Sequence, residues 1–181
     1  MADDAADIGA GEVEPEALRE PAPETLFGLP VTRSHGQVVL FPSREEYPAL
    51  LATLHEAGYH QVVDLTGVDY LVHPGRASLP TDVTAERFEV VVGLINHRER
   101  SRLRLRIQVP ASDPRLASAF ELYPGTEAME RETFDMFGIV FDGHPDLTRI
   151  LMPEDWIGHP LRKDYDSGRI PVQFKGAPAN R

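Results

Sequence analysis

The chain has 181 residues, a hydrophobic fraction of 41% and a formal net charge of −11, which fits one soluble domain with appendages. It contains no cysteine, so disulfides, thiolate zinc sites, a cysteine nucleophile and cysteine-ligated iron–sulfur clusters are excluded for this chain. No apolar run approaches the about 20 residues of a membrane-spanning helix, and the acidic start is unlike a signal peptide. The negative charge also argues against nucleic-acid binding.

The beginning of the chain differs in composition from the rest. Residues 1–24 contain eight acids, a single arginine and almost no large apolar side chain. Such a segment cannot bury enough apolar surface to offset the entropy lost on ordering. We therefore expect a disordered acidic segment at residues 1–30, with docking on a basic partner surface as the alternative. A domain at residues 31–141 and a tail at 142–181 follow it.

The domain is predicted to begin with a strand and a helix. Residues 37–41 are short and β-rich, and Pro42 ends them. Ser43 then stands as the N-cap of a helix, with Glu46 at the N3 position of a capping box. Apolar residues recur at helical spacing up to Gly58, where the helix is expected to stop; they are Tyr47, Leu50, Leu51 and Leu54.

Three more strands are predicted next. Residues 60–72 form the first, and the proline-rich and polar segment 73–85 is a loop. Residues 88–95 are apolar and β-branched, whereas residues 102–109 alternate strictly between apolar residues and arginine or glutamine. With residues 96–101 as the polar turn, these two runs predict a hairpin with one buried face.

Two helices are predicted to complete the domain. Asp113 is expected to cap a helix that starts at Pro114 and ends near Tyr123. A second helix is expected from Thr126 to Gly138. The order β-α-β-β-β-α-α predicts an α+β fold, with a small, mostly antiparallel sheet backed by helices on one face.

The tail has no periodicity of its own. After Phe141, prolines and glycines interrupt the chain repeatedly, yet the only tryptophan, Trp156, lies in this part. A long segment without a core usually lies on another surface, and tryptophan is a residue type that dominates interface energies. We therefore expect residues 142–181 to be an extended, irregular, partner-binding tail. Wrapping around its own domain and disorder are the alternatives.

One carboxylate is predicted on an apolar helix face. In the second helix, Glu130 falls within the apolar arc, whereas Arg131 and Asp135 fall on the opposite side and can pair at i,i+4. A buried carboxylate must be paired, hydrogen-bonded or protonated. We favour a structural ion pair, with Arg149, Arg162 or an arginine of a partner. A general acid/base or a metal ligand is the alternative.

The tripeptide Gly-His-Pro occurs twice, at residues 143–145 and 158–160. Aspartates nearby make a His/Asp metal site conceivable. However, the helical spacing of a zinc site is absent, and the segment has no framework to fix a coordination geometry. We therefore interpret His144 and His159 as hydrogen-bonded turn residues.

A long motif covers the second helix and the tail. Residues 130–139 read ERETFDMFGI, and GHPDL, RIL and GHPLRKDY follow at 143–147, 149–151 and 158–165. This series resembles the signature of the 30-kDa-type subunit family of respiratory complex I, which is the C-type subunit of bacterial NADH–quinone oxidoreductases. Two positions depart from the family pattern. Thr148 stands where the family commonly has an arginine, and the three residues before the motif, 127–129, also differ from the family's usual sequence.

The resemblance implies a non-catalytic scaffold subunit in the peripheral arm of a proton-translocating NADH–quinone oxidoreductase. Electrons would pass from NADH to quinone through FMN and iron–sulfur clusters in other subunits, so this chain would hold no cofactor, metal or catalytic residue. Its partners would be the D-type subunit that forms the quinone pocket and the B-type subunit that bears the neighbouring cluster. The complex would lie on the cytoplasmic side of the cell membrane, and this chain would contact the membrane only through it. The structural and interface residues would be Glu130, Arg131, Asp135, His144, Arg149, Trp156, His159, Arg162, Lys163 and Asp164.

Two other functions stay open at this point. The first is the equivalent subunit of a membrane-bound hydrogenase-type complex, which the LRKD sequence at 161–164 does not separate from complex I. The second is a stand-alone metal-dependent hydrolase that uses Glu130, His144 and His159, and it requires bound metal.

Overall fold

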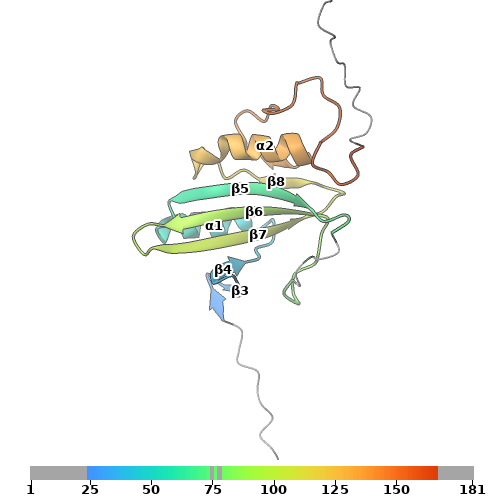
Figure 1. Ribbon diagram of the computed structural model, residues 1–181. Helices are drawn as coiled ribbons and strands as arrows, with labels where there is room; N and C mark the ends of the chain where they lie inside the picture. The colour runs from blue at the N-terminus through green and yellow to red at the C-terminus, as the bar shows by residue number, and fades with distance from the viewer. Residues whose placement is uncertain (1–23, 74–75, 77–78, 167–181) are drawn as a thin grey trace, which may run out of the picture.

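The computed structural model describes residues 24–73, 76 and 79–166 (Figure 1). The predicted acidic segment up to residue 23 and the tail from residue 167 lie outside the described residues. The elements are β1 (Thr25–Leu26), β2 (Leu29–Pro30), β3 (Thr32–Ser34), β4 (Gln37–Leu40), α1 (Tyr47–Glu56), β5 (Gln61–Asp69), β6 (Phe88–Asn96), β7 (Ser101–Val109), β8 (Arg115–Ala117), a 3₁₀ turn (Pro124–Thr126), α2 (Glu127–Phe137) and β9 (Val140–Asp142).

A five-stranded sheet with the order β3-β4-β7-β6-β5 is the centre of the fold. All neighbouring strands are antiparallel except β4 and β7, which run parallel. Figure 1 shows α2 lying along β5. Both helices share one apolar core with the inward side chains of the sheet, among them Leu54, Leu105 and Phe137. The predicted α+β class and the mostly antiparallel sheet are confirmed.

The hairpin of β6 and β7 follows the predicted alternation. Its register runs from the pair Phe88 and Val109 to the pair Asn96 and Ser101. Every second residue of β7 is buried in the core, whereas Arg102, Arg104, Arg106 and Gln108 alternate with these and face away from it. Alternation with a period of two therefore gives the sheet one apolar face and one basic face.

The reciprocal hydrogen bonds predicted between Ser43 and Glu46 are present, but they lie in the turn before α1, which begins at Tyr47 with Glu46 as its N-cap. The backbone N–H of Ser43 donates to the carboxylate of Glu46 at 2.9 Å, and the N–H of Glu46 donates to the Ser43 hydroxyl at 3.2 Å. Tyr47, the first residue of α1, is fully buried.

The helix predicted from Asp113 to Tyr123 is wrong. Residues 115–117 form β8, which pairs in parallel with β9. The N–H of Val140 donates to the carbonyl of Pro114, and the N–H of Ser118 donates to the carbonyl of Asp142, both at 2.8 Å. Long-range backbone pairing has overridden the local capping signal here, as tertiary contacts often do.

Two short pairings near the start of the described chain were not predicted. β1 and β2 form a hairpin within the segment expected to be disordered, and β3 adds an edge strand to β4. Strands of two or three residues carry too few side chains to show a periodicity. Among the described residues, no helix has the length and apolarity to span a membrane.

Candidate functional site

The described part of the tail, residues 143–166, lies on its own domain. Figure 1 shows this segment, coloured orange to red, in loops beside α2. Its backbone is joined to the domain by hydrogen bonds: the N–H of Leu161, for example, donates to the carbonyl of Met136 at 3.0 Å. For these residues the structure therefore shows the tail wrapped around its own domain, which is the arrangement that the sequence offered as an alternative to partner binding. Contact of the same residues with a partner stays a prediction.

Asp135 is the main attachment point for the tail. Its side chain is fully buried, and one oxygen lies 2.5 Å from the guanidinium of Arg149. The other oxygen accepts the backbone N–H groups of Ile150, Leu151 and Met152 at 2.8–3.1 Å. Burial alone would raise the pKa of Asp135, but the Met152 and Leu151 N–H groups and Arg149 outweigh it and hold the pKa below its usual value.

Arg131 attaches the same stretch of tail from one turn earlier in α2. It donates to the carbonyl and the hydroxyl of Thr148, at 3.1 and 2.9 Å, and to the carbonyl of Arg149 at 3.2 Å. Its ion-pair partner is Glu127, at 3.5 Å. The predicted i,i+4 pair of Arg131 with Asp135 is therefore wrong. The helix side that carries Arg131 and Asp135, opposite the apolar arc, is covered by the tail.

Both Gly-His-Pro histidines hold turns of the tail. His144 Nε2 lies 3.1 Å from the carbonyl oxygen of Glu127, and its Nδ1 accepts the N–H of Asp146 at 3.1 Å. His159 Nδ1 lies 2.9 Å from the carbonyl oxygen of Asp135. Burial lowers the pKa of His159, which favours the neutral ring at physiological pH.

The left-handed end of α2 leaves room for the tail. Gly138 has φ of 71°, and a Cβ atom there would lie 2.5 Å from side-chain nitrogens of both His159 and Arg162. Arg162 donates to the carbonyl of Phe137 at 2.6 Å, and its guanidinium lies over the ring of Phe88, 5.1 Å from the centroid. Glycine is required at this position for its conformation and for this close approach.

An acid at the end of β5 receives the last described turn of the tail. The buried carboxylate of Asp69 accepts the N–H of Lys163 at 2.9 Å and pairs with Arg87 at 2.8 Å. The same guanidinium pairs with Asp164 at 2.6 Å. Burial would raise the pKa of Asp69, but its hydrogen bonds from Arg87 and Lys163 lower it overall. Sequence reasoning missed Asp69 and Arg87, because nothing in their local pattern indicates a partner 77 or 94 residues away.

Glu130 is fully buried, as its position on the apolar arc indicated. Its carboxylate accepts the hydroxyl of Ser118 at 2.5 Å and the N–H of Ala119 at 2.7 Å. Neither Arg149 nor Arg162, the partners proposed from the sequence, forms an ion pair with it among the described residues. Burial therefore dominates and raises the pKa of Glu130. The role of Ser118 was hidden by the incorrect helix prediction.

The tail presents large apolar side chains outward. Ile157 is 89% exposed and Leu151 is 60% exposed, and Ile150 and Leu161 are also exposed. Trp156 is half-buried, and its indole N–H is buried without a hydrogen-bond partner among the described residues. Exposed apolar groups close together in sequence are typical of an interaction surface.

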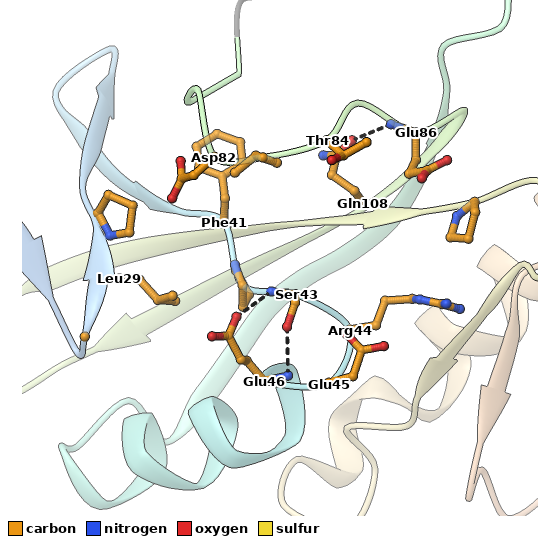
Figure 2. Close-up of a pocket in the computed structure, with 15 residues that line it drawn as sticks. Leu29, Phe41, Ser43, Arg44, Glu45, Glu46, Asp82, Thr84, Glu86 and Gln108 are labelled. Carbon is orange, nitrogen blue, oxygen red and sulfur yellow. Dashed lines mark hydrogen bonds between the residues drawn. The ribbon is translucent and has the colours of Figure 1, made fainter.

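The described residues do not gather metal-binding side chains in one place. They contain no group of three or more histidine, aspartate or glutamate side chains placed to bind a metal ion, so Glu130, His144 and His159 are not brought together. A surface hollow of about 580 Å³ lies beside the start of α1, and Figure 2 shows the residues that line it. The polar groups of its capping box are bonded to each other, and the Glu86 N–H donates to Gln108.

Taken together, these observations describe an α+β domain whose tail is attached along its last helix. Residues 41–170 match the family described as the 30-kDa subunit of respiratory-chain NADH dehydrogenase. The chain belongs to this family, as the resemblance predicted.

Curated relatives are named as the C-type subunit of NADH-quinone oxidoreductase. The relative from Saccharopolyspora erythraea is 40% identical over 164 residues, which cover 89% of this chain and 62% of the relative. The relative from Acidothermus cellulolyticus is 44% identical over 141 residues, 76% of this chain and 68% of the relative. For Roseiflexus castenholzii the identity is 44% over 158 residues, and the coverage is 87% and 84%. The chain thus spans 62% to 84% of the length of these three relatives.

Two solved structures have a similar fold. A trypsin-resistant fragment of Nqo5 superposes with a TM-score of 0.58 at 35% identity, over 66% of this chain and 90% of the fragment. A chain of the membrane-bound sulfane sulfur reductase, an archaeal respiratory membrane complex, superposes with a TM-score of 0.57. At 20% identity, over 84% of this chain and 90% of that one, it shows the shared fold alone.

Proposed function

We propose that this chain is the C-type subunit of a proton-translocating NADH–quinone oxidoreductase and serves there as a non-catalytic scaffold of the peripheral arm. The observation that carries the proposal is the two-sided tail. Its polar groups bond to Asp135, Arg131 and Asp69 of its own domain, whereas Ile157 and Leu151 face outward. A rigidly held apolar surface of this kind fits a permanent partner, since little ordering entropy remains to be lost on association.

The partners we propose are the quinone-pocket subunit, along the tail, and the neighbouring cluster-bearing subunit. FMN, the iron–sulfur clusters and quinone belong to those and other subunits, and this chain keeps its neighbours in register. Positioning is a sufficient role, because cofactor chemistry depends on how proteins place the reactive groups. The complex would hold this chain on the cytoplasmic side of the cell membrane, with no membrane contact of its own. The names of the relatives favour this assembly over a hydrogenase-type complex.

Affinity purification of the tagged full-length chain from native membranes tests the proposal. The quinone-pocket and cluster-bearing subunits are expected to co-purify with it, together with NADH–quinone oxidoreductase activity. The variant Ile157→Asp should lose them, because a charge would be placed in a desolvated interface. Val72→Asp is the matched control, since Val72 is 67% exposed on a loop outside the tail, and it should retain the partners.

Two outcomes would contradict the proposal. Full retention of the partners by the Ile157→Asp variant would mean that the tail is not the interface. Co-purification with hydrogenase-type subunits in place of NADH-oxidising ones would assign the chain to the other assembly.

A further inference from the structure

The sheet face opposite the two helices is basic. Arg102, Arg104 and Arg106 alternate along β7 with residues that point into the core. The register places Val39 of β4 and Gly93 of β6 on either side of Arg104. Because Gly93 has no side chain, the surface is recessed beside Arg104. We call this surface the basic face and define it by Arg102, Arg104 and Arg106.

Two hollows on the basic face flank Arg104. One has a volume of about 380 Å³ and is lined by Arg33 and Arg106 among others, and the second has a volume of about 180 Å³ and is lined by Arg102. Val91 and Arg104 line both hollows. The face therefore forms an interrupted groove across the strands, with apolar and cationic walls.

Two arginines of this face have no ion-pair partner among the described residues. Arg106 is neutralised by the buried Glu89, whose carboxylate lies 2.7 and 3.0 Å from the guanidinium. Arg102 and Arg104, in contrast, form no ion pair with any other described residue, and Asp64 is the one acid of the described chain that lines their hollow. In a chain with a formal net charge of −11, this is a local surplus of cations that would attract an anionic segment.

An acidic segment enters the described structure at β3, the edge strand of the sheet next to β4. Glu24 pairs with Arg33 through two contacts of 2.9 and 3.1 Å, and its carbonyl accepts the N–H of Val31, just before β3, at 2.8 Å. The preceding residues 1–23 contain seven acids and one arginine. An extended chain spans about 3.3 Å per residue, and neighbouring strands of a sheet lie about 4.8 Å apart. Fully extended, residues 1–23 are therefore long enough to cross the five-stranded sheet.

We propose that residues 1–23 bind to the basic face of their own chain, with carboxylates placed at Arg102 and Arg104. Tethering at Glu24 makes the association intramolecular, so an effective concentration in the millimolar range supports a contact that is weak per charge pair. Binding is therefore salt-sensitive. The segment competes with any other anionic ligand of the face.

A spin-label experiment on the full-length chain tests this proposal. The chain contains no native cysteine, so Ala10→Cys accepts a single nitroxide. In ¹⁵N-labelled protein, the amide signals of Val91, Gly93 and Arg104 should lose intensity at low salt. They should recover at about 1 M salt, where the screening length falls to about 3 Å.

Two triple Glu→Gln variants, each of which removes three negative charges, sharpen the test. The signal loss should disappear in the spin-labelled variant Glu12→Gln/Glu14→Gln/Glu16→Gln. It should persist in the matched control Glu121→Gln/Glu132→Gln/Glu154→Gln, which removes the same charge at exposed positions elsewhere.

Three results would overturn the proposal. The basic-face amides could keep full intensity at low salt, which would place the segment elsewhere. The loss could survive both salt and the segment variant, which would exclude charge as its cause. The loss could also appear in ¹⁵N chains without a spin label when they are mixed with spin-labelled ¹⁴N chains, which would assign the contact to a second copy.

Discussion

Asp135 and Arg149 form the buried ion pair that joins the last helix to the tail, with 2.5 Å between carboxylate and guanidinium. Replacing Asp135 with asparagine removes the charge but nearly preserves the shape, and leaves Arg149 partly buried without a counter-ion. Breaking a buried pair in this way should lower the free energy of unfolding by about 3–5 kcal/mol. Urea unfolding measures the loss, and limited proteolysis between residues 143 and 166 should accelerate.

The exposed pair of Arg115 and Asp142 provides the control for this experiment. The variant Asp142→Asn should change stability little, because exposed pairs are well screened by water and salt. Equal losses in the two variants would contradict the role assigned to Asp135.

Stability should fall at acid pH through the two tail-anchoring aspartates. The pKa values of Asp135 and Asp69 are lowered in the folded state. Their contribution is therefore complete above the unfolded pKa of about 3.9 and is lost as pH falls through the lower folded values. Thermal unfolding between about pH 2 and 6 should show this decline, and Asp69→Asn should flatten it. An unchanged acid limb in that variant would disprove the assignment.

Glu130 should show the opposite dependence on pH. Burial raises its pKa, so its contribution is present below the unfolded value of about 4.3 and is lost as pH rises through the folded value. The variant Glu130→Gln should therefore gain stability relative to the native chain between about pH 4 and 7. Glu130→Ala leaves the buried N–H of Ala119 unsatisfied and should cost about 2–3 kcal/mol. Identical pH profiles for the native chain and Glu130→Gln would refute this account.

Two buried tyrosines should respond differently to loss of the hydroxyl. The hydroxyl of Tyr47 is buried without a hydrogen-bond partner among the described residues, and burial raises its pKa. Tyr123 donates to the carbonyl of Tyr59 at 2.9 Å, and burial raises its pKa to about 12. Tyr47→Phe should be neutral or stabilising, whereas Tyr123→Phe should lose about 1 kcal/mol. Denaturation curves of the two variants and the native chain measure the change in the free energy of unfolding. A larger loss in Tyr47→Phe than in Tyr123→Phe would contradict the hydrogen-bond assignment.

Substitution of Gly138 should loosen the tail. A Cβ there meets His159 and Arg162, and the backbone is left-handed. Gly138→Ala should therefore destabilise the chain by about 1–2 kcal/mol through the left-handed conformation alone and expose the tail to protease. The control is Gly125→Ala, since a Cβ at Gly125 meets nothing within 4 Å. Equal protease sensitivity of both variants would show that the close approach is unimportant.

The sequence predicts those elements whose pattern of apolar and polar residues, or whose capping residues, lie within a few residues of one another. The alternation of β7 and the reciprocal bonds between Ser43 and Glu46 are of this kind. The incorrect helix at 113–123 shows the limit: Asp113 and Pro114 give a valid helix signal, but the partner of β8 is β9, encoded more than 20 residues later.

The ten residues assigned from the resemblance lie on α2 or in the tail segment, and their role at an interface stays a prediction. The pairings of Glu130 and Asp135 differ from those that the helical-wheel argument predicted. Asp135 has the arginine, and Glu130 has the hydroxyl and amide. A helical wheel assigns burial from the helix alone, so it cannot detect that an irregular tail covers the polar side.

The inward bonding of the tail separates two tasks that a single segment often shares. Arg149, His159 and Arg162 secure the segment to its own domain, while the side chains of Ile157 and Leu151 are largely exposed and bury little surface against that domain. Substitutions at the latter positions can therefore alter recognition without unfolding the chain. The same scaffold could thus be re-specified for a different assembly by changing a few side chains, with its architecture left intact.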